Sequence, residues 1–245
     1  MSGATGPTRA ILLPSYRWNP YQRLLASALT EAGVEASAVH EWSTRAPLLG
    51  TWWQQGRPDV VHIHWVHEFL GGSKGRPSSR QVRWVEWQLR ALKRAGVRIV
   101  WTVHNLKSHE SAGDDPNDRA AHQAIIERAD AIILHCDYAR EALVELYRPS
   151  HAAQARMHVL AHGSYVRQYD VDLGQEAARR ALGLTDAGTV FAFVGSIRGY
   201  KNVGELLDAF IRTDELSPDD RLLIAGKPLP RKFGRKLEKL AQEDK

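Results

Sequence analysis

Short apolar runs alternate along the chain with segments whose apolar residues recur every three or four positions. The short runs predict eight strands, and the periodic segments between them predict helices. The clearest helices are residues 80–95 and residues 203–212. The predicted strands are residues 9–14, 34–39, 59–65, 97–103, 130–136, 157–162, 189–195 and 221–226.

The predicted strands contain few polar residues. Strands of this kind are typical of a parallel sheet with helices on both faces, so we expect a doubly wound, Rossmann-like α/β fold. Ligands of such folds bind outside the carboxyl ends of the strands, which directs attention to the residues after each strand. Six strands complete a first domain, residues 1–170. Residues 171–245 hold two strands and three helices, too few for a closed doubly wound domain, and we expect a truncated second domain.

Composition narrows the class of protein. The chain has 245 residues, of which 43% are hydrophobic and 25% are charged, as in an ordinary globular protein. The single cysteine, Cys136, allows no internal disulfide, and we expect it to pack within its apolar run. Neither an apolar leader nor a run long enough to span a membrane is present, so we expect a cytoplasmic protein.

The net charge of +5 suits an anionic ligand or an acidic membrane surface. Basic residues cluster in residues 228–240, where Phe233, Leu237 and Leu240 recur at helical spacing. We weigh two interpretations of this segment, an ordinary surface helix and a helix that touches the inner face of a membrane. No recognisable nucleic-acid-binding motif is present, so we expect no nucleic-acid partner.

Histidines and aromatic residues mark the exit of the third strand. His62 and His64 lie on one face of that strand, and Trp65 and His67 follow it. Three histidines so close together invite a metal interpretation. However, His62 lies deep in an apolar run, and no cysteine or carboxylate has the spacing of a zinc site. We therefore expect histidines that pack in the core or face a ligand, and no bound metal.

The fourth strand runs into His104 and Asn105, and His109 and Glu110 follow shortly after. A histidine at a strand exit lies at the mouth of the cleft, where it can donate to a sugar hydroxyl or phosphate oxygen or transfer a proton near neutral pH. A histidine that caps a helix or is merely solvated is the alternative.

The residues after the first and sixth strands lack the motifs of a dinucleotide site and of a serine hydrolase. After the first strand, Tyr16 and its aromatic and basic neighbours stand where a dinucleotide site has glycines, and no G-x-G-x-x-G follows any strand. These side chains either stack on a sugar and grip an anion or pack beneath a helix. Gly163 follows the sixth strand, as a close backbone turn into the cleft would require. The G-x-S-x-G spacing of serine hydrolases is absent there.

The stretch GSIRGYK, residues 195–201, approaches a phosphate-binding P-loop but lacks its second glycine and its magnesium-binding hydroxyl. Arg198 and Lys201 nevertheless precede a helix that begins near Val203. The free N–H groups and the dipole at the start of a helix favour negative charge. Gly195, Arg198 and Lys201 therefore form a candidate pyrophosphate site that requires no metal.

Four motifs together resemble the nucleotide-sugar-dependent glycosyltransferases of the GT-B fold, most closely the GT4-like family. They are PDVVHIHW, TVHN, the HG that ends the first domain, and FVGSIRGYKNVGELLDAF. The resemblance implies that Lys201 and Arg198 hold the donor's diphosphate, although Ser196 occupies the usual arginine position. It also implies that His104 faces the donor sugar and that acceptor surface lies around Tyr16, Trp65 and His67.

The resemblance implies transfer of a sugar from a nucleoside diphosphate sugar to a glycan or lipid-linked acceptor, with retained configuration and without a metal or other cofactor. The family's E-x7-E glutamate pair is missing from residues 171–245, so we expect this chain alone to be inactive or nearly so. Two alternatives stay open: a catalytically silent sugar- or nucleotide-binding module of the same fold, and a sugar-nucleotide epimerase related to it.

Overall fold

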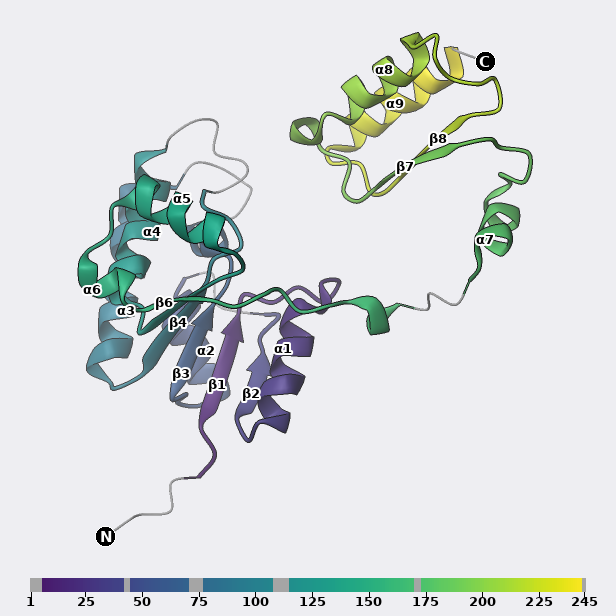
Figure 1. Ribbon diagram of the computed structural model, residues 1–245. Helices are drawn as coiled ribbons and strands as arrows, with labels where there is room; N and C mark the ends of the chain where they lie inside the picture. The colour runs from purple at the N-terminus through teal and green to yellow at the C-terminus, as the bar shows by residue number, and fades with distance from the viewer. Residues whose placement is uncertain (1–5, 42–44, 71–76, 108–114, 170–172, 244–245) are drawn as a thin grey trace. The chain divides into compact units, whose positions relative to one another are not determined.

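The chain folds into two units, Met1–Tyr169 and Asp170–Lys245 (Figure 1). The predicted boundary lay between residues 170 and 171. The structure is a computed structural model, and it describes residues 6–41, 45–70, 77–107, 115–169 and 173–243.

The first unit is built on a six-stranded parallel sheet with the strand order β2-β1-β3-β4-β5-β6. All six predicted strands are present, each shortened by one to three residues at its ends. The observed strands are β1 (Arg9–Leu13), β2 (Glu35–Ala38), β3 (Val60–Ile63), β4 (Arg98–Thr102), β5 (Ala131–Leu134) and β6 (Met157–Val159).

Helices connect these strands. Because parallel crossovers are right-handed, the reversal of strand order at β1 puts the helix after β1 on one face of the sheet and the later helices on the other. This arrangement is the predicted doubly wound α/β fold. The helices are α1 (Pro20–Glu31), α2 (Pro47–Gln55), α3 (Ser79–Arg94), α4 (Pro116–Arg128), α5 (Asp137–Tyr147) and α6 (His151–Gln154).

Local sequence explains where the helices begin. The Ser78 side chain accepts from the backbone N–H of Gln81, and the Gln81 side chain accepts from the backbone of Ser78, which completes a capping box for α3. Asn19 and Asp115 cap α1 and α4 by accepting from backbone N–H groups of the first turn, and each is followed by a proline at the first helical position. The helix predicted over residues 80–95 is confirmed, one residue earlier at both ends.

The core of the first unit lies between the sheet and helices α2 to α6. Val82, Val85, Leu89 and Leu92 of α3 are buried there against strand residues such as Trp101. Each apolar side chain of this kind contributes about 1.5–3 kcal/mol when it is fully removed from water. This rigid sheet holds the strand exits in fixed positions. Cys136, predicted to pack, is instead exposed at the start of α5.

The second unit contains a parallel pair of strands, β7 (Val190–Val194) and β8 (Arg221–Ala225), with α7 (Gln175–Leu182), α8 (Val203–Arg212) and α9 (Arg231–Glu243). Both predicted strands are confirmed, and α8 has the predicted bounds. Leu237 of α9 is buried with Leu207 of α8, and Phe233 and Leu240 pack partly against the same cluster. The apolar stripe of the basic segment 228–240 therefore packs on the unit's own core, as in an ordinary surface helix.

Candidate functional site

A histidine follows each of four strands in the six-stranded sheet, and the four rings gather at its carboxyl edge. His64 follows β3, His104 follows β4, His135 follows β5 and His162 follows β6. The ring of Tyr21, from the first turn of α1, lies among them. Its centroid lies 4.8 Å from that of His104, 5.0 Å from that of His162, 5.6 Å from that of His64 and 5.7 Å from that of His135.

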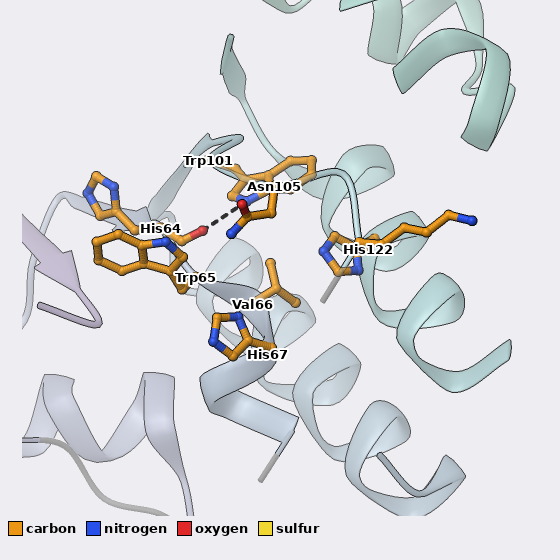
Figure 2. Close-up of a pocket in the computed structure, with 8 residues that line it drawn as sticks. His64, Trp65, Val66, His67, Trp101, Asn105 and His122 are labelled. Carbon is orange, nitrogen blue, oxygen red and sulfur yellow. Dashed lines mark hydrogen bonds between the residues drawn. The ribbon is translucent and has the colours of Figure 1, made fainter. Parts of the chain in front are cut away.

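His64 is anchored on three sides. Its backbone N–H donates to the carbonyl of Leu13 at 2.9 Å, and its carbonyl accepts from the Trp101 indole N–H at 3.3 Å, the dashed line in Figure 2. Its ring stacks on that of His62, with centroids 4.4 Å apart. His62 in turn lies 2.8 Å from the Thr102 hydroxyl through Nε2. These contacts hold the backbone of His64 on both sides and cover one face of its ring.

The contact between His64 and His104 sets the proton positions of both rings. Nδ1 of His64 lies 3.0 Å from Nε2 of His104, whereas the buried Nε2 of His64 meets no hydrogen-bond partner among the described residues. An orphaned buried N–H is rarer than an orphaned acceptor, which favours the tautomer with the proton of His64 on Nδ1. His64 then donates to His104, and His104 carries its own proton on Nδ1. His104 consequently offers an N–H donor to a ligand.

Burial keeps these histidines neutral. It lowers the pKa of His62 to about 4 and, with the neighbouring ring of His135 as a smaller cause, the pKa of His104 to about 3. It also lowers the pKa of His64 well below its ordinary value, and the nearby ring of His62 adds to the effect. At neutral pH, His104 therefore acts as a hydrogen-bonding group and carries no positive charge.

Aromatic rings lead from the protein surface to His104. Trp65 stacks on His104 with centroids 4.6 Å apart, and the Tyr16 ring lies 4.8 Å from that of Trp65. Trp18, which is 77% exposed, stacks on Tyr16 at 5.2 Å. The Tyr16 hydroxyl donates to Glu68 and so is held in place. A row of ring faces beside a hydrogen-bond donor can hold the apolar face of a sugar.

His67 and Asn105 line a small cavity at the same strand exits, together with His64 and Trp65 (Figure 2). Its other lining residues include the buried His122 and Trp101. His67 lies 3.4 Å from Glu68, and hydrogen bonding to His67 is the main reason that the pKa of Glu68 is lowered. His64 and Trp65, which both contact the His104 ring, also line this cavity, and Glu68 links Tyr16 to His67. The structure therefore brings the predicted residues Tyr16, Trp65, His67 and Asn105 together at one site.

In the second unit, Lys201 folds back over the end of β7. A Cβ atom added to Gly195 would lie 3.5 Å from the Lys201 ammonium, which also lies 6.0 Å from the centroid of the Phe193 ring. No carboxylate within the described ranges pairs with Lys201. Arg198 is half-buried and begins the 3-10 turn Gly199–Lys201.

The start of α8 adds a second feature that favours an anion. Asn202 has φ 53° and makes no side-chain capping bond to the helix. The first N–H groups of α8 are therefore not satisfied by a cap, and they lie next to Lys201 in the chain. Gly195, Arg198 and Lys201 all lie in the short segment between β7 and α8. Phosphate binding by these residues stays a prediction.

The remaining predictions concern His109, Glu110, Gly163 and a bound metal. His109 and Glu110 lie outside the described residues. An added Cβ at Gly163 would meet nothing within 4 Å of the protein itself, and its predicted close approach to a ligand stays a prediction. Within the described ranges, no three histidine, cysteine or carboxylate side chains are arranged to hold a metal ion.

His135 was not predicted as a member of the site, Tyr21 was predicted only as one of the aromatic residues at the cleft mouth, and His162 only as part of the HG motif. The signal was present, because a histidine within three residues of the end of each of four neighbouring parallel strands must bring the rings to one edge. Each histidine taken by itself was uninformative.

Comparison with known proteins identifies glycosyltransferases that are similar to the chain in sequence. No family model matches the chain. It is 31% identical over 208 residues to a D-inositol 3-phosphate glycosyltransferase of Mycobacterium sp. strain JLS, an alignment that covers 82% of this chain and 39% of the relative. The protein of the same name from Corynebacterium urealyticum is 33% identical over 198 residues, with 76% of this chain and 42% of the relative covered. The chain thus spans about two fifths of the length of these relatives.

Solved structures show the fold. HepE of Anabaena, crystallised with UDP and glucose, superposes with a TM-score of 0.61 at 13% identity, over 97% of this chain and 66% of that one. A glycosyltransferase of Rickettsia africae gives a TM-score of 0.55 at 13% identity, over 97% of this chain and 65% of that one. The chain is thus similar in sequence to GT4-like glycosyltransferases and has the GT-B fold.

Proposed function

We propose that the protein takes part in sugar transfer from a nucleoside diphosphate sugar to a glycan or lipid-linked acceptor. The observation that carries the proposal is the position of His104, a neutral N–H donor held by His64 and stacked on Trp65 at the carboxyl edge of the sheet. That edge is where ligands of doubly wound folds bind. HepE, which shares the fold, was crystallised with UDP-glucose, so UDP-glucose is the first donor to test.

The donor's diphosphate would lie at the turn before α8. The Lys201 ammonium, the Gly195 backbone and the uncapped N–H groups of α8 supply positive charge and donors without a metal ion. Because Gly195 has no side chain, a phosphate can approach its backbone and the Lys201 ammonium at the same time. Both features support a leaving group stabilised by the protein itself.

In the proposed reaction, an acceptor hydroxyl oxygen forms a bond to the anomeric carbon as the bond from that carbon to the diphosphate oxygen breaks. The bonding electrons leave with the nucleoside diphosphate, and the acceptor proton passes to a phosphate oxygen. Donation from the N–H of His104 to a sugar hydroxyl would hold the ring in place during this step. Retention of configuration follows if the acceptor attacks from the side of the leaving group, where that phosphate oxygen lies.

The row Trp18, Tyr16 and Trp65 is the proposed acceptor side. Ring faces stack on sugar rings, so a glycan or glycosylated lipid is favoured over a simple alcohol. A catalytically silent binding module is the second candidate. It is favoured by the serine at position 196, where the family has its diphosphate-binding arginine.

Release of UDP from UDP-glucose, measured with and without a panel of acceptors, distinguishes the two candidates. We expect acceptor-dependent release by a longer natural chain that contains residues 1–245, and none or nearly none by residues 1–245 alone. Equal turnover by the longer chain and by residues 1–245 would refute the expectation that residues 1–245 alone are inactive. Binding of UDP-glucose without release by the longer chain would favour the silent module.

A matched pair of variants tests His104 in the longer chain. His104→Phe keeps an aromatic ring on Trp65 but removes the donor, and we expect kcat/KM to fall roughly 10-fold to 100-fold, as for a lost hydrogen bond in a buried site. His104→Asn keeps an amide N–H near the position of Nδ1 and should lose less. Equal loss in the two variants would show that the donor is not what matters.

A further inference from the structure

Helix α3 carries two tryptophans on its solvent side. Trp84 and Trp87 stack face to face, with centroids 4.8 Å apart and ring planes 5° apart. They are 42% and 49% exposed. The core does not require them, because the opposite side of the helix supplies the buried residues Val82, Val85, Leu89 and Leu92.

Arginines surround the tryptophan pair. At 100° per residue, the side of α3 that points away from the core carries Trp84 and Trp87 together with Arg80, Arg83, Arg90 and Arg94. Arg90 pairs with Glu86 at 2.7 Å. No carboxylate in the described part of the chain pairs with Arg80, Arg83 or Arg94, and all three side chains are exposed. We call these six residues the Trp/Arg face.

We propose that the Trp/Arg face of α3 docks on the surface of a membrane that contains anionic lipid. The guanidinium groups can bind lipid phosphates through two N–H donors each. Indole rings prefer the boundary between headgroups and acyl chains, where one side is apolar and the other wet. A surface helix with a buried apolar side and this outer composition is suited to lie flat on such a surface. This proposal does not rest on the proposed sugar transfer.

A nucleic-acid partner fits the Trp/Arg face less well. Bases stack on open ring faces, and the stacking of Trp84 on Trp87 leaves only the outer face of each ring for a base. The indole N–H of Trp84 is also engaged, because it donates to the carbonyl of Arg45. A lipid interface needs apolar bulk at the right depth and does not need open ring faces.

The basic helix α9 is the other candidate for membrane contact. Its apolar stripe is already packed against α8, with Leu237 6% exposed. It retains a basic side but has no aromatic residue there to enter the interface. We therefore place the contact on α3 of the first unit.

Co-sedimentation with vesicles tests the proposal. The 245-residue chain is mixed with vesicles of phosphatidylcholine alone or with 30% phosphatidylglycerol, a composition of about one anionic lipid in three. We expect binding to the anionic vesicles only, weakened by salt. Arg83→Gln/Arg94→Gln should lower the apparent affinity about 25-fold, at about fivefold for each arginine. Trp84→Ser/Trp87→Ser should lower it at least 10-fold.

Two controls keep the outcome interpretable. Lys232→Gln/Lys236→Gln on α9 removes the same charge as the arginine variant and should bind nearly as the parent chain does. Unchanged unfolding midpoints by far-UV circular dichroism would show that the variants are folded. The proposal is overturned if the parent chain does not bind anionic vesicles or if folded α3 variants bind them as well as the parent chain does. It is also overturned if the parent chain binds single-stranded nucleic acid through α3 and binds no vesicle.

Discussion

Gly226 is the residue whose substitution should most selectively damage the candidate phosphate site. A Cβ atom at this position would lie 1.7 Å from the carbonyl oxygen of Gly195, a distance at which the two backbones cannot remain together. Gly226→Ala must therefore push the exit of β8 away from the exit of β7. The site residue Gly195 lies on the other side of that contact.

The magnitude follows from the hydrogen bonds that join the two exits. Gly195 N–H donates to the Ala225 carbonyl at 2.9 Å, Ile197 N–H to that of Lys227 at 3.0 Å, and Leu229 N–H to that of Ile197 at 2.9 Å. Each bond contributes about 0.5–1.5 kcal/mol, so loss of all three should destabilise the second unit by about 1.5–4.5 kcal/mol. A loss of this size is a large fraction of the stability of a small unit.

Amide hydrogen exchange provides the assay, because it reports the two units separately. We expect protection of the β7 and β8 amides to fall in Gly226→Ala, while protection of β1, β3 and β4 stays the same. All eight tryptophans lie in the first 101 residues, so the tryptophan fluorescence transition should also stay the same. Gly199→Ala is the matched control, because an added Cβ there meets nothing within 4 Å. Unchanged β7 protection in Gly226→Ala would refute the close approach of the two exits.

The remaining predictions concern charge and protons. The pKa of His62 is about 4 when folded and near its ordinary value of 6.5 when unfolded, so the unfolded chain binds the extra proton between these values. Stability of the first unit should therefore fall as pH drops from 6.5 towards 4, by up to about 1.4 kcal/mol per pH unit for each such histidine, and His62→Leu should flatten a urea-unfolding pH series. His64→Leu should shift the proton of His104 from Nδ1 towards Nε2, whereas His64→Asn keeps a donor and should leave it on Nδ1. The 15N chemical shifts of the His104 ring measure the position of this proton. A proton on Nε2 of His104 in the parent chain would refute the inferred tautomer. Lys201→Met should weaken UDP binding roughly 10-fold or more in calorimetry, and an unchanged affinity would remove Lys201 from the phosphate site.

Much of the fold could be predicted from sequence, because its signals are local. Each strand is an apolar run of its own, and the α8 pattern gave both ends of that helix. The turn before α8 was also predictable, since Gly195 and Lys201 are six residues apart in the chain. Errors arose where packing decides. Cys136 lies in an apolar run yet faces solvent, because it ends the strand segment and begins α5.

The ring cluster around Tyr21 could not be predicted residue by residue. His64, His104, His135 and His162 are up to 98 residues apart in sequence, and only the strand order brings them to one edge. The proton positions depend on a single distance between two rings. Likewise, the stacking of Trp84 and Trp87 depends on side-chain rotamers that the helical pattern leaves open.

The central claim has two parts: the turn between β7 and α8 of the second unit binds a nucleoside diphosphate, and His104 of the first unit donates to a sugar hydroxyl. A titration of the 15N-labelled chain with UDP and with UDP-glucose, followed by backbone and histidine-ring NMR signals, tests it most directly. We predict that both ligands shift the amides of Gly195, Lys201 and Val203, and that UDP-glucose alone also shifts the ring signals of His104. Binding that leaves residues 195–203 unperturbed and shifts signals elsewhere would contradict the account.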